Sequence, residues 1–276
     1  MSVGMHGLSS CHNHTQMSDG VLTLDDMVHA AIRQGFSDIG ISDHSCLAAE
    51  PPHATGDADA YIAALRSAKA HFAGQIRVAA GLELDALSSF PARAQLDYVI
   101  GSVHYMHDKA TDCFYGVDWD EATAQSCINE MFGQNGLAYV KAYYEAVAEN
   151  ALHTRPDVIG HFDLVVKPNA RGVLFDEESP AYRAAALEAL DACCEAGSIL
   201  EVNTGGVFRG WRSTFYPAPF VLRRAKEKGM RAMINADAHC AEALCFGFET
   251  ARALLREAGF RSVAVLRDGA FADEPL

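Results

Sequence analysis

Two histidines near the start of the chain have a spacing that suits the binding of one metal ion. They are His12 and His14, and Asp19 follows between Ser18 and Gly20. In an extended segment, side chains two residues apart point to the same side, so both imidazoles would face one point. A turn through Ser18 and Gly20 would bring the carboxylate of Asp19 back to the same place. The alternative is two unrelated histidines near a flexible end of the chain.

Histidine, aspartate and glutamate recur at the ends of later apolar segments. Six of the twelve histidines occupy such positions, and Asp237-x-His239 repeats the spacing of the first pair. The segment ends supply nine candidate metal ligands: His12, His14, Asp19, His44, Glu83, His104, His161, Asp237 and His239. Imidazole and carboxylate donors without thiolate suit divalent Zn, Mn or Fe. Nine are enough for two or three ions, with Glu83 able to bridge. The alternative is that some are core histidines hydrogen-bonded to nearby carboxylates.

The segments that carry these residues alternate between short strands and helices. After a first strand at the opening motif, the pattern predicts strands at 38–44, 76–85, 97–105, 157–163, 198–203 and 230–239. It predicts helices at 24–32, 58–73, 180–196, from 217–219 onward and at 251–258; the run 262–266 is an eighth strand or a peripheral one. This alternation indicates βαβ units and a parallel sheet. Because nearly all strands end in His, Asp or Glu, a barrel with one convergent rim is favoured over an open sheet.

Composition indicates one ordered globular domain over residues 1–276. Half of the residues are hydrophobic and 21% are charged. We expect an irregular segment and then a largely helical insertion at about 106–150. The net charge of −14 argues against nucleic acid or anionic membrane as general partners. The eight cysteines form no Cys-x-x-Cys pair, and neither a signal peptide nor a membrane span is recognisable. We therefore expect a cytoplasmic protein with reduced thiols; its oligomeric state is left open.

Six motifs, in order along the chain, resemble those of the PHP (polymerase and histidinol phosphatase) superfamily. They are His12-Asn-His14-Thr with Ser18-Asp19-Gly20, Ser42-Asp43-His44, Gly81-Leu-Glu83, Gly101-Ser-Val-His104, Gly160-His161-Phe-Asp163-Leu and Ala236-Asp237-Ala-His239. The resemblance spans about residues 10 to 240. It implies a distorted (β/α)7 TIM-like barrel with a trinuclear metal site at the carboxyl ends of the strands, and the nine candidates occupy the family's ligand positions. The family often has an acidic residue where this chain has Ser10, which puts a contact behind the ligands in doubt.

Further stretches resemble the histidinol-phosphate phosphatase branch, although relatives that act on other phosphate esters share parts of them. These stretches are 97–105, 157–167 and 201–212, the last continuing into 216–219. In such a site, two cations about 3.5–4 Å apart hold the attacking and leaving oxygens, and a metal-bound hydroxide is the expected nucleophile. The cations also explain how an acidic protein binds an anion.

Several side chains outside the nine are candidates for contact with the substrate. Arg209 is the first choice to bind the phosphate, with a solvated loop arginine as the alternative; Arg212 and Lys167 are weaker candidates. Asp163 is the candidate general acid, or else orients a ligand histidine. For Glu201 and Asn203 we expect either contact with the substrate or hydrogen bonds that hold the loop after their strand. For His53 and His107 we expect either an approach to an imidazole of the substrate or a position on the surface.

The sequence therefore predicts a metal-dependent phosphomonoesterase of histidine biosynthesis that hydrolyses L-histidinol phosphate to L-histidinol and phosphate. The alternatives are a related PHP phosphoesterase for another small phosphate ester or nucleotide, a nucleic-acid proofreading module, and a non-catalytic metal-binding protein. Within the site, we expect His12 and His14 to share one ion with Glu83 and Asp237. We expect Asp19, His44 and His239 to hold a neighbouring ion.

Overall fold

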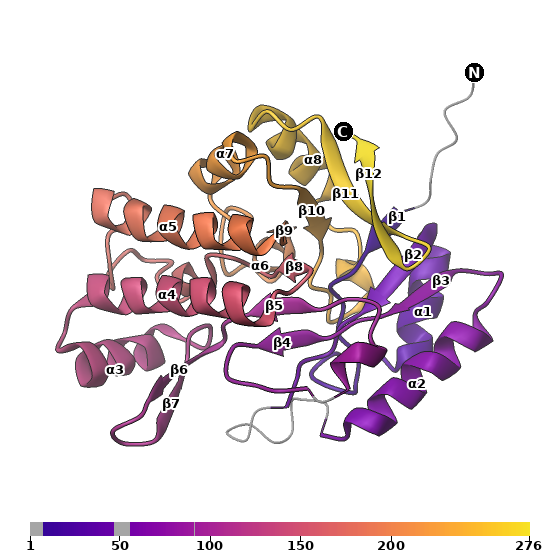
Figure 1. Ribbon diagram of the computed structural model, residues 1–276, viewed down its shortest axis with the longest axis horizontal. Helices are drawn as coiled ribbons and strands as arrows, with labels where there is room; N and C mark the ends of the chain where they lie inside the picture. Colours follow the sequence, from indigo (N-terminus) through magenta and orange to yellow (C-terminus); the bar gives the residue numbers. More distant parts are fainter. Residues whose placement is uncertain (1–7, 47–55, 91) are drawn as a thin grey trace.

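Parallel strands make up most of the β structure. The computed structural model describes residues 8–46, 56–90 and 92–276 (Figure 1). One sheet has three parallel strands in the order β1 (Leu8–Ser10), β2 (Phe36–Ile41) and β3 (Arg77–Ala80). The other has the order β12-β11-β10-β9-β8-β5-β4, in which β12 pairs antiparallel with β11 and the remaining neighbours are parallel. Its strands are β4 (Glu83–Asp85), β5 (Ile100–Ser102), β8 (Val158–Ile159), β9 (Ile199–Asn203), β10 (Ala232–Asn235), β11 (Ser262–Arg267) and β12 (Ala270–Pro275).

The two sheets meet at the carboxyl ends of their strands. Isolated parallel bridges join Asn13 to Ala238 and His44 to Glu83 there. A small apolar cluster takes side chains from strands of both sheets: Cys11, Ala79, Tyr98, Ile100, Val158, Ile199, Met233, Ala264 and Leu266. The predicted α/β class is confirmed. The hydrogen-bonded ladders form two sheets that share this interior, and their strand ends gather at one side of it.

Helices flank the sheets on several sides. In Figure 1, α4 and α5 lie side by side, α1 and α2 lie beside the three-stranded sheet, and α7 and α8 lie near β10 and β11. The helices are α1 (Leu24–Arg33), α2 (Ala58–His71), α3 (Glu121–Phe132), α4 (Gly136–Thr154), α5 (Pro180–Ala196), α6 (Gly205–Phe208), α7 (Pro219–Glu227) and α8 (Phe248–Glu257). Short 3₁₀ turns are η1 (Arg93–Gln95), η2 (Leu164–Val166) and η3 (Ala241–Ala243).

Local sequence signals set the ends of several helices. The Thr23 side chain accepts a hydrogen bond from the backbone N–H of Asp26 and caps α1. Helix α5 begins at Pro180 behind a Ser179 cap and ends at Gly197, whose φ of 82° favours glycine. The predicted helices at 24–32, 58–73, 180–196 and 251–258 are therefore confirmed to within a few residues.

Several predicted strands are shorter or divided. The expected strand 157–163 is reduced to β8, and the expected strand 230–239 to β10. The expected strand 76–85 splits into β3 and β4, which lie in different sheets, and the expected strand 97–105 keeps only β5. The break in the first falls at Gly81, where a Cβ atom would lie 2.1 Å from the ring of Tyr98. The Tyr98 hydroxyl donates a hydrogen bond to the carbonyl of Cys11. The ring therefore occupies the space in which the chain passes from one sheet to the other.

The segment expected to be irregular contains a hairpin instead. Strands β6 (Tyr105–Asp108) and β7 (Cys113–Gly116) pair antiparallel, and α3 and α4 follow as the predicted helical insertion. The run 262–266 is a strand of the large sheet, and β12 beside it was not predicted. The predicted loop containing His53 lies outside the described residues.

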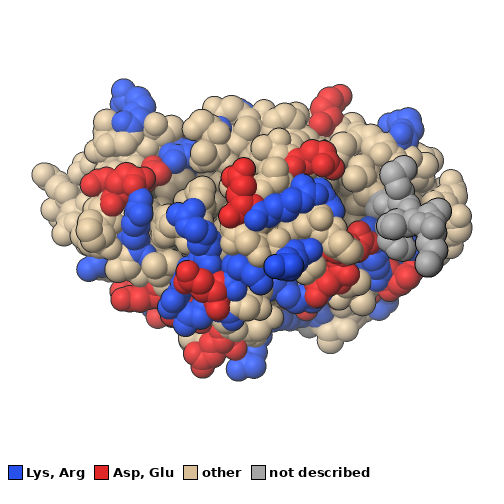
Figure 2. Space-filling model, turned by 90° about the horizontal axis from the view of Figure 1, so that it is seen from above, with Lys and Arg blue, Asp and Glu red and all other residues tan. Residues whose placement is uncertain are grey.

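The face seen from above in Figure 2 carries charges of both signs. Lysine and arginine side chains lie next to aspartate and glutamate over much of this face. Among the described residues, a pair of opposite charge joins α7 to α5, where Arg224 Nη2 lies 2.9 Å from Asp191 Oδ2. This face therefore lacks the one-sign basic patch typical of nucleic-acid binding. Within the described chain, no helix has the length and apolar character needed to span a membrane.

Gly81→Ala is expected to destabilise the protein by about 2 kcal/mol or more, because the new methyl group overlaps the Tyr98 ring between the two sheets. Urea unfolding monitored by circular dichroism measures the loss. Gly56→Ala is the matched control, since a Cβ there meets nothing within 4 Å. Equal stability of the two variants would show that the close approach of Tyr98 to Gly81 is not required.

Candidate metal centre

All nine predicted metal ligands come together at one site, eight of them after the carboxyl end of a strand and Glu83 at the start of β4. His12, His14 and Asp19 follow β1, and His44 follows β2. The remaining five come from the large sheet, where they begin β4 or follow β5, β8 and β10: Glu83, His104, His161, Asp237 and His239. Side chains separated by more than 200 residues in sequence thus share one site. Their roles as ligands stay predictions.

Glu83 is the centre of this arrangement. It is 1% exposed. Its two carboxylate oxygens lie 2.8 to 3.5 Å from nitrogens of five imidazoles, those of His12, His14, His44, His104 and His161. Burial would raise the pKa of Glu83, but His12, His44 and His104 hold it well below its ordinary value. The carboxylate is therefore ionised at neutral pH and can bind cations on both of its oxygens.

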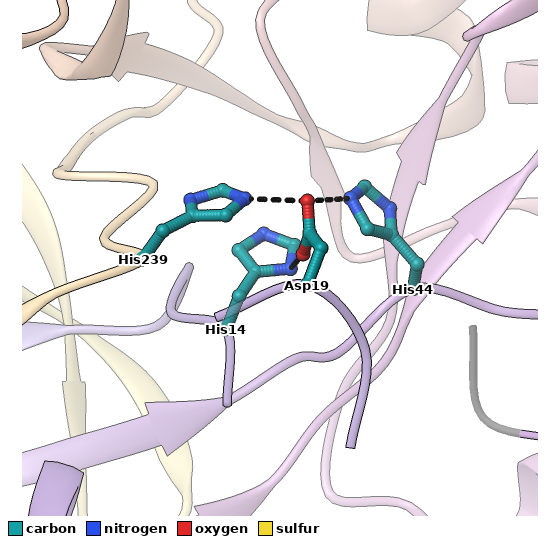
Figure 3. A group of neighbouring side chains, drawn as sticks. All are labelled: His14, Asp19, His44 and His239. Carbon is teal, nitrogen blue, oxygen red and sulfur yellow. Dashed lines mark hydrogen bonds and ion pairs between the residues drawn. The ribbon is translucent and has the colours of Figure 1, made fainter. Parts of the chain in front are cut away.

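Asp19 forms a second focus on the more open side of the site (Figure 3). Its carboxylate lies 3.0 Å from His239, 3.5 Å from His14 and 3.7 Å from His44. The three imidazoles point toward this carboxylate from three different segments of the chain. The side chain of Asp19 is 30% exposed, so this focus is closer to solvent than Glu83.

Asp237 lies between the two foci. Its Oδ1 is 3.3 Å from His14 Nε2, 3.5 Å from His239 Nδ1 and 3.8 Å from His12 Nε2. Its Oδ2 accepts a hydrogen bond of 2.7 Å from Arg209 Nη2. Asp237 also has a φ of 49°, a left-handed conformation uncommon for a residue with a side chain. The left-handed conformation thus occurs at the residue whose carboxylate enters the cluster.

The donors fit divalent metal ions in three respects. First, the described residues contain four overlapping groups whose donor atoms lie within 4.8 Å of one another: His14, Asp19, His44 and His239; His12, His14 and Glu83; His12, His161 and Asp237; and His44, Glu83 and His104. Second, several buried atoms that could bind a metal have no hydrogen-bond partner among the described residues. These atoms are His12 Nε2, both ring nitrogens of His14, Glu83 Oε2 and His161 Nδ1. Third, burial and the neighbouring His239 and His44 lower the pKa of His14 to about 3, which leaves its imidazole neutral, as a metal ligand must be.

The grouping differs from the predicted one in the position of His14. We expected His14 to act with His12, Glu83 and Asp237, and it does lie near all three. It also joins Asp19, His44 and His239, with its ring stacked on His239 at 4.2 Å between centroids. His14 therefore belongs to both halves of the site, because the turn that carries Asp19 folds back over it.

A layer of further carboxylates supports the histidines from behind. Glu201, fully buried on β9, lies 2.7 Å from His12 Nδ1 and accepts the backbone N–H of His161 at 2.7 Å. Asp85 holds the backbone N–H of His104 at 2.8 Å. Asp43 accepts the backbone N–H of Thr15 at 2.7 Å and so anchors the turn to Asp19. These contacts fix the direction of the imidazoles before any ion binds.

The position of Glu201 does not fit one of its two predicted roles, contact with the substrate. It lies under the cluster and does not line the cavity described below, so contact with a substrate has no support. Asn203 donates to Glu201 and accepts the backbone N–H of Gly205, which is the predicted role of tying down the loop. The sequence contained a sign of this burial. Glu201 lies within the predicted strand, two residues before its polar end, where buried side chains are expected.

A cavity of about 580 Å³ opens over the cluster. Candidate ligands form part of its lining. Another part is aromatic and charged: Tyr105, Asp118, Trp119, Lys167, Arg209, Trp211 and Tyr216. Within it, Arg209 adjoins the ligands, since its Nη1 lies 3.1 Å from His239 Nδ1. Two of the predicted phosphate-binding side chains, Lys167 and Arg209, are thus in the cavity wall. His107 is not among the lining residues and lies 2.8 Å from Asp112, in the hairpin.

Two predicted functional residues lie outside the cavity. Arg212 makes hydrogen bonds to Glu177 and to the carbonyl of Val166, so its guanidinium is engaged elsewhere. Asp163 is 2% exposed and accepts the backbone N–H of Ala218 at 2.8 Å. Neither position supports the predicted contact with substrate. Both residues are near cavity-lining residues in the sequence, but their side chains do not line the cavity.

The α/β fold and the converging nitrogen and oxygen donors define a candidate metalloprotein. Residues 10–205 match the PHP domain family, and the chain therefore belongs to this family. A protein of Deinococcus radiodurans named "Probable histidinol-phosphatase" is 31% identical over 280 residues, which cover 94% of this chain and 96% of that protein. The histidinol-phosphatase of Bacillus subtilis is 24% identical, over 82% of this chain and 91% of its own length.

A solved structure has the same fold. It is a histidinol phosphate phosphatase from Lactococcus lactis, complexed with Zn, L-histidinol and phosphate. Its TM-score to this chain is 0.70 at 21% identity, covering 95% of this chain and 98% of that one. At this identity the likeness establishes the fold and not the activity.

Asp163→Asn is expected to change how stability depends on pH. Burial raises the pKa of Asp163 to about 7, whereas a carboxyl of an unfolded chain titrates near about 4. The stability from protonated Asp163 is complete below about pH 4 and is lost as the pH rises to about 7. Asparagine imitates the protonated form, so the variant should gain about 2 kcal/mol relative to wild type between pH 5 and pH 8.

Urea unfolding of both proteins at the two pH values measures this gain. Asp25→Asn, on the exposed side of α1, serves as the control and should shift stability equally at both. An Asp163→Asn effect that is the same at pH 5 and pH 8 would show that Asp163 is buried in its charged form.

Proposed function

We propose that this protein is a metal-dependent phosphomonoesterase that hydrolyses L-histidinol phosphate to L-histidinol and phosphate. The observation that carries the proposal is the buried Glu83 cluster, which borders a cavity that is also lined by Lys167 and Arg209. Membership of the PHP family and relatives named histidinol-phosphatase over nearly the whole chain support the choice of reaction and substrate.

The nine clustered side chains would hold two or three divalent ions, with Zn, Fe and Mn as candidates. Cations bound there supply positive charge that neutralises phosphoryl oxygens and lowers the pKa of water. Side chains of this protein hold the cluster in place and bind the phosphoryl group. Glu83 and Asp237 stay ionised within the cluster, and Glu201 keeps His12 turned toward it. Lys167 and Arg209, which line the same cavity, bind the phosphoryl group.

The aromatic and acidic part of the cavity would accept the remainder of the substrate. Tyr105 and Trp119 offer ring faces, and Asp118 offers a carboxylate, all within the same wall. An imidazole-bearing alcohol has the flat ring and the positive charge that such a surface binds. We also propose that the whole chain acts as one cytoplasmic domain whose two sheets function together as a distorted (β/α)7 barrel.

A substrate panel tests the proposed reaction. Metal-loaded protein should release phosphate from histidinol phosphate with a kcat/KM at least about tenfold above that for generic phosphate monoesters and nucleotides, a difference of about 1.4 kcal/mol in transition-state binding. Phosphate release measured with each ester at equal concentration gives the ranking. If another small ester ranks first, the protein is a related phosphoesterase and the assignment of histidinol phosphate is wrong.

Glu83→Gln is expected to lower both metal content and activity, because the neutral amide leaves the surrounding imidazoles without their shared negative charge. Metal analysis of the purified variant should show at least one ion fewer per chain than wild type, and kcat should fall at least about 100-fold. Glu195→Gln, an exposed position on α5, is the matched control.

The same measurements separate the enzyme from a non-catalytic metal-binding protein. A wild type that binds metal but hydrolyses no ester would support the second. In that case the double change of His12→Ala and His14→Ala would remove metal without any activity to lose.

A further inference from the structure

Trp211 stands out because two cationic side chains lie against its ring. Lys167 Nζ is 3.4 Å from the ring centroid, and the central carbon of the Arg209 guanidinium is 4.4 Å from it. All three residues line the cavity. The face of an indole attracts cations more strongly than that of other aromatic side chains. The ring is thus a contact shared by both positive groups of this wall.

Each of the two cations is also tied to a carboxylate. Lys167 Nζ lies 2.9 Å from Asp118 Oδ2, and Arg209 Nη2 lies 2.7 Å from Asp237 Oδ2. The side chains of Lys167 and Arg209 are only 10% and 19% exposed. Because both cations contact the same ring, their like charges repel each other, particularly where water is largely excluded. The carboxylates and the shared ring offset that repulsion.

Local backbone geometry brings Arg209 to this place. A Cβ on Gly205 would lie 2.7 Å from Arg209 Nη2, so glycine leaves the room that the guanidinium occupies. The backbone N–H of Trp211 donates to the carbonyl of Gly206 at 2.9 Å and fixes the turn that follows α6. Trp211 itself is 38% exposed. Its indole is therefore placed on the cavity wall, although a buried position would stabilise the fold more.

Both cations keep donors for an anion. An ammonium has three N–H groups and a guanidinium has five. One ammonium contact goes to Asp118, and the Nη groups of Arg209 reach Asp237 and His239 Nδ1. Arg209 Nε is buried, so the donors left for an anion in the cavity are the remaining N–H groups of Lys167 Nζ and Arg209 Nη2. A tetrahedral anion with several acceptor oxygens, such as a phosphoryl group, would satisfy these donors.

We propose that Trp211 is a positioning residue, which holds Lys167 and Arg209 together so that both bind one phosphoryl group. The proposal rests on the phosphatase function above. Trp211 acts through the two cations and takes no part in bond breaking. Its removal should therefore weaken the binding of phosphate and phosphate esters more than it slows turnover.

Inorganic phosphate is the probe for a direct test on the metal-loaded protein. Isothermal titration calorimetry should show that Trp211→Leu weakens phosphate binding about 3- to 30-fold, the range that one or two lost cation–π contacts would produce. Trp211→Phe, which keeps a ring face, should stay within about threefold of wild type. With the ester substrate, KM should rise in Trp211→Leu in parallel with the loss of phosphate affinity, while kcat changes less than about threefold.

Phe246→Leu is the matched control, because Phe246 has the same 38% exposure and packs on Phe208, and none of the described cations lies over its ring. It should bind phosphate as wild type does. Trp211→Gln provides the same test as leucine if the leucine variant does not fold. A double-mutant cycle with Lys167→Met should be non-additive, since part of the effect of Trp211 passes through Lys167.

The outcomes for the two proposals differ. Equal phosphate affinity in wild type and Trp211→Leu, or equal loss in the Leu and Phe variants, would overturn the positioning role. An additive cycle with Lys167→Met would overturn it as well. Wild type that binds phosphate with the expected dependence on Trp211, yet hydrolyses no ester, would overturn the proposed function and leave the positioning role intact.

Discussion

The burial of one carboxylate, that of Glu83, constrains much of this structure. A charged carboxylate removed from water is very costly unless positive charge or hydrogen-bond donors surround it. Here five imidazoles do so, and they come from the ends of strands in both sheets. The two sheets must therefore meet near this point, where backbone bridges join His44 to Glu83 and Asn13 to Ala238. The unpartnered ring nitrogens that remain are the atoms which metal ions would satisfy.

A second layer of carboxylates makes the cluster rigid. Glu201, Asp85 and Asp43 accept hydrogen bonds from imidazoles or from the backbone of the loops that carry them. Because these acceptors are buried and already paired, the imidazoles keep one orientation. The two cations of the cavity are held in a similar way, by groups of opposite charge and by an aromatic ring: Asp118, Asp237 and Trp211 contact Lys167 and Arg209. An acidic protein thus gains a local positive surface.

Secondary structure was predictable where its causes are local. The caps at Thr23 and Ser179 and the glycine at 197 act through atoms only a few residues away, so the helices were found with nearly correct ends. The division of the run 76–85 into two strands was not predictable, because its cause is the ring of Tyr98 packed against Gly81. The hairpin at β6 and β7 and the strand β12 were missed as well.

The sequence by itself determined the set of candidate donors, because histidine and carboxylate residues occur at successive strand ends and parallel strands bring such ends to one side. Only the tertiary structure decided which donors face each other. It placed His14 in both halves of the site, turned Arg212 toward Glu177, buried Asp163 away from the cavity and put Glu201 beneath His12. It also brought the ring of Trp211 into contact with two cations, Lys167 and Arg209, that lie 42 residues apart in sequence. These pairings depend on contacts between distant segments, which spacing along one strand does not encode.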